Sequence, residues 1–454
     1  MRALVLLYYF PPSGGPGVQR GLKLCRELPA LGIEPSVVTV APQTYREPGE
    51  YVPDPSLDAE VPAGLRIVRT PSGRRLRVET ALHTVRAMRL ARHAAPSAFF
   101  ERQAAWFRPA LDACLGEVRR ARPVVLLTSS QPWTAHLVGR EVRRRTGLPW
   151  VADFRDPWMT AWGRTWPSER AWCWEHERED EVLRDADRVV ANTPGSLREM
   201  LVRRPWLPPG KFAVVPNGYD PADFAVPPAA RDVADFVIVH SGAFRAAPPG
   251  SVRTGLRGWI DRSAFAPLPY DLSTHTPQTL FEAMARLPDG PGRRVRARLV
   301  GRLDPRWLDL ARSLGVGERV EALGYLPHRE AASHVLAADL LYLPTVTRTD
   351  GEPATNVPAK TYEYLGSGRP IAALAGPGDV RDLLAGRDRV SLLGPRSADG
   401  LAALVAGLAA LPRAPDTAPD PPDARPWRRG EIARRMAAVL AGAARAPVEP
   451  GNVR

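Results

Sequence analysis

The sequence predicts an α/β protein with two successive domains, each a doubly wound parallel sheet covered by helices. The chain has 454 residues, which is more than a single hydrophobic core usually serves. Short apolar runs alternate with helix-patterned segments, as in strand–helix–strand units. This alternation pauses after Asn217 and Gly218, crosses a proline-containing stretch at 227–233 and then starts again. We therefore expect one domain over 1–225 and a second over 235–411.

The first domain begins with an apolar run at 3–10 that reads as a buried strand. A helix is expected over 18–31, because Val18, Leu22, Cys25 and Leu28 recur on one helical face. Helical stretches separate most of the later apolar runs, which is the order that a parallel sheet requires. The further strands of this domain are expected at 36–40, 66–69, 124–128, 150–154, 188–191 and 212–215.

The second domain repeats the pattern, with strands expected at 236–239, 296–300, 319–323, 340–343, 370–374 and 389–393. Residues 246–269 are rich in Gly, Pro and Arg and read as a long flexible insertion. A Pro-rich linker at 412–427 precedes a last helix at 428–445, for which a return to the first domain is one interpretation. Two such sheets that face each other would place their carboxyl-end loops around a shared central cleft.

The composition excludes several classes of protein. Three scattered cysteines without a CxxC pair exclude a disulfide framework, argue against a zinc site and fit a reducing cytoplasm. No apolar run approaches the roughly 18–20 residues of a membrane span. The net charge of +13 favours acidic partners such as nucleotide phosphates or an anionic membrane surface. Nucleic acid is the least favoured of these partners, and none is expected, because the arginines are dispersed and no binding module is recognisable.

The most informative segment runs from Asn356 to Ile371. It follows the apolar run at 340–344 and opens a short helix whose Pro358 suits the first turn. Lys360 and Glu363 lie three residues apart near the amino end of that helix, where free N–H groups and the helix dipole attract phosphate. Lysine is rare here, with three among 62 basic residues, which hints that a compact ammonium is needed. The alternative is an ordinary strand–helix turn with a surface salt bridge.

Two loops of the first domain are further candidates. Gly14, Gly15 and Gly17 join the first strand to its helix, and glycines let backbone N–H groups approach a ligand closely. A tight structural turn is the alternative. Asp153 and Arg155 follow the strand at 150–154, where they are suited to bind acceptor hydroxyls and to stabilise a shifting charge. The alternative for this pair is a structural ion pair.

Three strand ends of the second domain complete the set. Gly242 would permit close approach to a diphosphate, and Arg245 would neutralise a leaving group. A structural turn with an exposed arginine is the alternative. Gly301 and Tyr325 follow neighbouring strands, where they are expected to enclose a base.

In this order the motifs resemble those of the family 4 retaining glycosyltransferases with the GT-B fold, which has two Rossmann-like domains. The most specific elements are the Val-Pro-Asn-Gly run at 215–218 and the segment that begins at Asn356 and contains Lys360. That segment is similar to the branch of the family that builds surface polysaccharides and glycolipids. The resemblance covers residues 1–410 approximately.

The resemblance implies a role for each motif. Glu363 would bind the donor ribose, while Lys360 and the backbone near Asn356 and Val357 would hold the diphosphate. The loop with Gly14, Gly15 and Gly17 would approach donor phosphate and acceptor. Arg155 would take the place of a catalytic-site histidine of many relatives. The resemblance implies no metal and no cofactor.

Two departures from the family pattern stand out. The position of a second glutamate, eight residues before Glu363, is Thr355 here, and Glu352 is a substitute. The usual Arg and Lys after the first glycine of the second domain are not recognisable, and the candidates for that role are Arg245, Arg253 and Arg257.

We expect a cytoplasmic transferase that moves a UDP- or GDP-linked sugar to a lipid-linked saccharide or a metabolite, with retention and without metal. Arg155, Asp153, Arg245 and Lys360 are the catalytic candidates. A nucleotide-sugar epimerase and a catalytically silent partner of another transferase are the alternatives. The basic segment at 74–107 is read either as a helix that covers the sheet or as a peripheral contact with the inner membrane face. A membrane adaptor that acts through this segment is a third alternative function.

Overall fold

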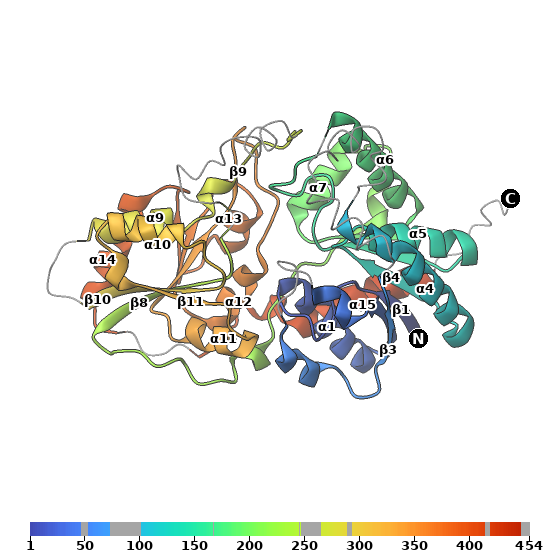
Figure 1. Cartoon of the computed structure of the whole chain (residues 1–454), viewed down its shortest axis with the longest axis horizontal. Coiled ribbons are helices and arrows are strands. Elements are labelled where there is room, and N and C mark those ends of the chain that lie inside the picture. Colours follow the sequence, from blue (N-terminus) through green and yellow to red (C-terminus); the bar gives the residue numbers. More distant parts are fainter. Residues whose placement is uncertain are drawn as a thin grey trace. The chain divides into compact units, whose positions relative to one another are not determined.

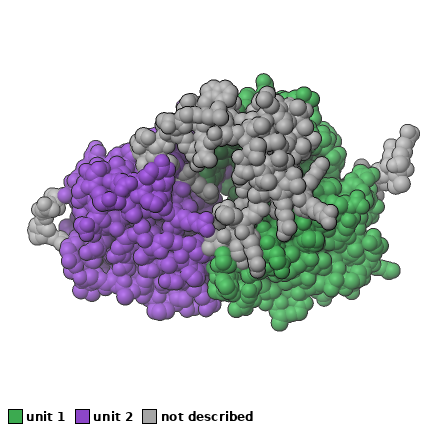
Figure 2. Space-filling model, viewed as in Figure 1, with its two compact units in different colours: residues 1–217, 260–267, 429–454 green, residues 218–259, 268–428 purple. Residues whose placement is uncertain are grey.

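The computed structural model describes residues 1–46, 53–72, 101–166, 168–244, 246, 265–287, 293–413 and 418–445. The chain divides into two compact units (Figure 2). Unit 1 comprises Met1–Asn217, Ile260–Pro267 and Arg429–Arg454, and unit 2 comprises Gly218–Trp259 and Leu268–Arg428. The shared cleft expected between two domains stays a prediction.

Unit 1 contains a parallel sheet of seven strands in the order β3-β2-β1-β4-β5-β6-β7 (Figure 1). The strand order reverses between β1 and β4, because the connections lead from β1 toward one edge of the sheet and from β4 toward the other. Its strands are β1 (Arg2–Leu6), β2 (Glu34–Val40), β3 (Arg66–Thr70), β4 (Val125–Ser129), β5 (Trp150–Phe154), β6 (Arg188–Ala191) and β7 (Phe212–Val214). Its helices are α1 (Pro16–Glu27), α4 (Phe107–Ala121), α5 (Thr134–Thr146), α6 (Glu169–Asp185), α7 (Pro194–Arg203) and α15 (Arg429–Arg445).

Unit 2 contains a parallel sheet of six strands in the order β11-β10-β8-β12-β14-β15, which reverses between β8 and β12. Its strands are β8 (Asp235–Ser241), β10 (Arg294–Val300), β11 (Val320–Gly324), β12 (Leu340–Pro344), β14 (Ile371–Leu374) and β15 (Val390–Leu393). Its helices are α9 (Gln278–Ala285), α10 (Arg306–Ser313), α11 (His328–Leu336), α12 (Ala359–Ser367), α13 (Asp379–Leu384) and α14 (Ala398–Ala410). A short antiparallel pair that the sequence pattern did not reveal, β9 (Tyr270–Asp271) with β13 (Thr347–Arg348), lies apart from the sheet.

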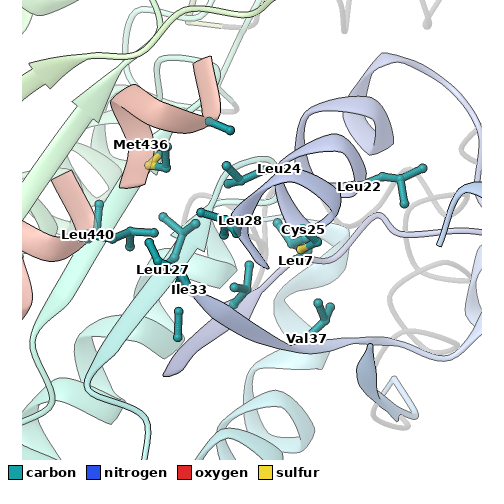
Figure 3. Packing of buried hydrophobic residues seen from close by; sticks show 14 of the residues in the cluster. Leu7, Leu22, Leu24, Cys25, Leu28, Ile33, Val37, Leu127, Met436 and Leu440 are labelled. Carbon is teal, nitrogen blue, oxygen red and sulfur yellow. The ribbon is translucent and has the colours of Figure 1, made fainter. Parts of the chain in front are cut away.

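The core of unit 1 joins the two ends of the chain. Met436 and Leu440 of α15 pack in one buried cluster with Leu24 and Leu28 near the end of α1 and with Leu127 of β4 (Figure 3). The last helix therefore completes the layer that covers the first sheet. In unit 2, two separate clusters pack on opposite faces of the sheet, one with α11 and α12 and the other with α9, α10 and α14.

Several expected boundaries differ from the observed ones, and three of these differences have a physical explanation. Strand β1 ends at Leu6 and not at residue 10, although Phe10 is fully buried. The expected end was wrong because an apolar run indicates burial and does not show where strand pairing stops. The first helix stops at Glu27 and continues as a 3-10 turn (Leu28–Leu31), since Pro29 has no N–H to donate. Residues 218–225 belong to unit 2, where Phe224 joins the core.

Parts of two segments expected as flexible connections are packed. In the stretch expected as a linker, Asp420 accepts hydrogen bonds from the Tyr219 hydroxyl and the Arg428 guanidinium, and Ala424 is fully buried. In the stretch expected as an insertion, Phe265 exchanges two backbone hydrogen bonds with Trp166, both 2.8 Å. Hydrogen bonds and burial fix these residues despite a composition typical of loops. Residues 247–264 and 414–417 lie outside the described residues.

Candidate functional site

The carboxyl edge of the unit 2 sheet is where its topology favours a ligand, because β8 and β12 lie beside the reversal of strand order. Helix α12 starts after the end of β12 in the chain, with Pro358 as its N-cap residue. The first N–H groups of such a helix have no partner within the helix and carry a partial positive charge. A negatively charged group is therefore favoured at this end.

Two side chains of α12 fix the helix to the end of β8. The Tyr364 hydroxyl accepts a 2.7 Å hydrogen bond from the backbone N–H of Ser241. One turn earlier, Lys360 Nζ lies 3.1 Å from Nε2 of the buried His240. Between them, Glu363 lines a small pocket together with Ser241 and residues of α11. Lys360 and Glu363, predicted from spacing alone, thus both lie at this edge.

Glycines bring the strand ends of unit 2 into close contact. Gly242 has φ of 114° and a side-chain Cβ there would lie 2.7 Å from Lys360 Nζ. Gly301 has φ of 128° and a Cβ there would lie 2.7 Å from the Gly242 backbone. The Gly301 N–H also donates a 2.6 Å bond to the carbonyl of Gly324, and Tyr325 follows with 37% of its surface exposed. Any larger residue at 242 or 301 would strain the backbone and displace its neighbour.

The segment before α12 is held against the loop that follows β14. Ala354 accepts a hydrogen bond from Asp379 N–H and donates one to Pro377. Thr355 and Val357 are buried, and Asn356 between them is half-buried. Glu352 is exposed on a preceding turn. Arg245, Arg253 and Arg257 lie outside the described residues.

In unit 1 the Asp153 carboxylate is enclosed by hydrogen-bond donors. Arg20 of α1 contacts both of its oxygens, at 2.9 and 2.7 Å, and the Ser129 hydroxyl donates at 2.7 Å. The side chains of Arg20 and Asp153 are 4% and 1% exposed. Arg20 also donates to the carbonyls of Val215 and Pro216 at the end of unit 1. This geometry favours a structural role for Asp153, with Arg20 and not Arg155 as its ion-pair partner, and makes Asp153 a residue that positions Arg20.

Arg155 lies beside the glycine loop. Its guanidinium is near Gly17, where a Cβ would come 2.6 Å from Nη1, and it pairs with Asp156 at 2.9 Å. Gly15 is the N-cap residue of α1 with φ of 92°, and Pro16 follows in the first turn. Gly14 is half-buried in the same loop. The amino end of α1 and Arg155 therefore form one positively charged corner of unit 1.

Two residues of these sites were not assigned a role from the sequence. Arg20 stands one helical turn after Gly17, and His240 stands two residues before Gly242. The closeness of each residue to a predicted glycine was the sequence signal that could have pointed to it. Their partners Asp153 and Lys360 are distant in sequence, and only the fold reveals these contacts.

The end of the basic segment at 74–107 is buried. Trp106 has no exposed surface, donates a 2.7 Å hydrogen bond to Thr70 and packs edge-on against Tyr8. Residues 74–100 lie outside the described residues. Among the described residues, helices of the length and hydropathy that a bilayer crossing requires do not occur.

Comparison with known protein families finds a match in the first part of the chain. Residues 14–218 match the family described as glycosyl transferase 4-like domain. Comparison with curated proteins found no match.

Among solved structures, the chain is similar to sucrose-phosphate synthase from Thermosynechococcus elongatus, with 17% identity over 98% of this chain and 96% of that one and a TM-score of 0.57. A glycosyltransferase from Rickettsia africae has 13% identity over 98% and 99% of the two chains and a TM-score of 0.57. WaaG, a glycosyltransferase involved in lipopolysaccharide biosynthesis, has 15% identity over 99% and 100% and a TM-score of 0.52. At these identities the likeness establishes the fold, which is GT-B with two Rossmann-like domains.

Proposed function

Since residues 14–218 match the glycosyl transferase 4-like domain and the fold is GT-B, we propose that the protein transfers a sugar from a nucleotide-diphosphate sugar to an acceptor. The observation that carries this proposal is the carboxyl edge of the unit 2 sheet. There Lys360 lies over Gly242 at the amino end of α12, and Glu363 faces the adjoining pocket. The positive charge of Lys360 and of the helix end suits a diphosphate, and the carboxylate of Glu363 can accept hydrogen bonds from ribose hydroxyls.

In this proposal the helix end and Lys360 stabilise the leaving group. The bond between the anomeric carbon and the diphosphate oxygen breaks, and its electron pair stays on the diphosphate. The ammonium and the helix N–H groups compensate the negative charge that develops, and interactions that strengthen in this way lower the barrier. The acceptor hydroxyl attacks on the same face and forms the new bond to the anomeric carbon while its proton passes to the departing diphosphate, so the anomeric configuration is retained. We propose that this charge compensation requires no metal ion.

Unit 1 would bind the acceptor near Gly17 and Arg155 in this proposal. The amino end of α1 and the Arg155 guanidinium supply donors and positive charge for an anionic or hydroxylated group. A lipid-linked saccharide or a metabolite fits such a corner. We propose that the protein works in the cytoplasm, with peripheral contact to the inner membrane face when the acceptor is lipid-linked, in the biosynthesis of a polysaccharide or glycolipid.

The direct test is product analysis with radiolabelled UDP- and GDP-sugars and a membrane lipid extract. Transfer of label to an acceptor, with release of the nucleoside diphosphate, is the expected result, and the anomeric configuration of the product is read by NMR. Conversion of the sugar while it stays on the nucleotide would establish an epimerase instead. A protein that binds no nucleotide and turns over no donor would point to a silent partner of another transferase.

A further inference from the structure

His240 is a buried imidazole beside the proposed diphosphate site. It lies in β8, two residues before Gly242, and has no exposed surface. Its ring stacks on Phe244, with centroids 4.1 Å apart and planes 15° apart. A histidine enclosed in this way has few orientations, so each ring nitrogen has a defined partner.

The partner of Nδ1 determines the tautomer. Nδ1 lies 3.0 Å from the backbone carbonyl oxygen of Tyr342. A carbonyl only accepts, so the proton is on Nδ1, and Nε2 of the neutral ring has a lone pair. Burial, and after it the charge of Lys360, lower the pKa of His240 well below its usual range. The ring is therefore neutral at physiological pH.

The neutral Nε2 atom is a suitable acceptor for an ammonium. Lys360 Nζ lies 3.1 Å from it, and an ammonium only donates, so the bond runs from Lys360 to His240. The same ammonium lies close to Gly242, where an added Cβ would come within 2.7 Å of Nζ. His240 and Gly242 together define one position for the charge.

The helix itself does not depend on this bond. Tyr364, one turn after Lys360, fixes α12 to the neighbouring residue Ser241 by its own 2.7 Å bond. Tyr364 and Leu365 are also fully buried in the core of unit 2. The bond to His240 therefore acts on the lysine side chain, which has a long and flexible stem.

We propose that His240 is a positioning residue that holds the Lys360 ammonium over Gly242 for the diphosphate of a nucleotide ligand. This proposal rests on the proposed function and adds to it a residue that is not in contact with the nucleotide. An ammonium fixed before binding loses less side-chain entropy when the ligand arrives, which increases affinity.

Three variants separate positioning from a structural role. His240→Phe keeps an aromatic ring for the stack on Phe244 and removes the acceptor. His240→Gln replaces the ring with an amide that again offers an acceptor oxygen. Lys360→Met removes the charge. Calorimetric binding of UDP and GDP is compared with binding of uridine and guanosine, which lack the phosphates.

For His240→Phe we expect about tenfold weaker binding of the preferred diphosphate, a change of about 1.4 kcal/mol, and nucleoside binding within about twofold of wild type. His240→Gln is expected to restore most of the diphosphate affinity, and Lys360→Met to lose at least as much as His240→Phe. If His240→Phe binds the diphosphate as wild type does while Lys360→Met does not, the positioning role is wrong and the proposed function stands. Equal loss of nucleoside and diphosphate binding would reveal a purely structural role and also overturn the inference.

A second measurement needs no variant of His240 and no ligand. Nitrogen NMR of the wild-type imidazole is expected to show a protonated Nδ1 and an unprotonated Nε2, and the opposite tautomer would overturn the inference. If the wild type binds neither diphosphate, or if Lys360→Met binds it unchanged, the donor site of the proposed function fails, and the positioning role fails with it.

Discussion

Replacing Asp153 with asparagine should destabilise unit 1 strongly. The carboxylate is 1% exposed and accepts two hydrogen bonds from Arg20, whose side chain is 4% exposed. Asparagine keeps the shape but removes the charge and turns an amide N–H₂ toward a donor. The Arg20 guanidinium then remains buried, with only carbonyl groups and the amide oxygen near it.

The size of the effect follows from this burial. Breaking a buried ion pair by removing one partner costs about 3–5 kcal/mol. In a domain of roughly 150–250 residues, 1 kcal/mol shifts the melting temperature by about 2–4 °C. The expected loss is therefore about 6–20 °C. For Asp156→Asn in the same loop the expected change is under about 1 kcal/mol, because that carboxylate is 43% exposed.

Thermal melting followed by circular dichroism measures both variants, and Arg20→Met with the double variant completes a cycle. The two single losses should be far from additive, since each variant breaks the same pair. An Asp153→Asn protein that melts within 2 °C of wild type but loses transferase activity would refute this reasoning. It would assign Asp153 to the chemistry, as the sequence analysis expected.

Three further outcomes follow from the same structure. Burial lowers the pKa of His136 from 6.5 to about 3, so the unfolded chain takes up a proton that the folded protein does not. The free energy of unfolding should therefore decrease as the pH drops from about 6.5 toward 3, by as much as about 4–5 kcal/mol. A pH series of melting curves should show a smaller decrease in melting temperature for His136→Phe than for wild type. Gly366→Ala should lower the free energy of unfolding of unit 2 by about 1–3 kcal/mol, because the added Cβ would overlap the buried ring of Tyr219. An unchanged melting temperature would contradict this contact. Gly242→Ala should weaken diphosphate binding about tenfold, since the φ of 114° at Gly242 and its 2.7 Å approach to Lys360 both oppose a side chain. A wild-type affinity of this variant in calorimetry would contradict the prediction.

Most of the fold was predictable from the sequence. Each apolar run that was interpreted as a strand overlaps a strand of one of the two parallel sheets; two of them have the expected ends, and the ends of the others differ by at most four residues. Parallel strands are buried on both faces, so they appear as continuous apolar runs that are easy to recognise. The pair β9 and β13 was missed because two-residue strands carry no periodicity.

The candidate site was predictable only where chemistry and local spacing coincide. Lys360 and Glu363 were found because a helix start and a phosphate-binding residue pattern occur in one short segment. The role of Asp153 was not predictable, because its partner Arg20 is 133 residues away and a carboxylate at a strand end looks the same whether paired or catalytic. The contact between His240 and Lys360 was not predictable for the same reason, since the two residues are far apart in the sequence.

We propose above that the carboxyl edge of the unit 2 sheet binds a nucleotide through α12. The most direct test measures the melting temperature of wild type, Glu363→Ala and the exposed control Glu318→Ala against a panel of nucleotides and nucleotide sugars. A ligand at about 100 times its dissociation constant adds roughly 2.7 kcal/mol, which corresponds to a shift of about 5–10 °C. We predict this shift for wild type and Glu318→Ala with one nucleotide family, and its loss in Glu363→Ala. Equal shifts in all three proteins, or no shift in any of them, would contradict the claim.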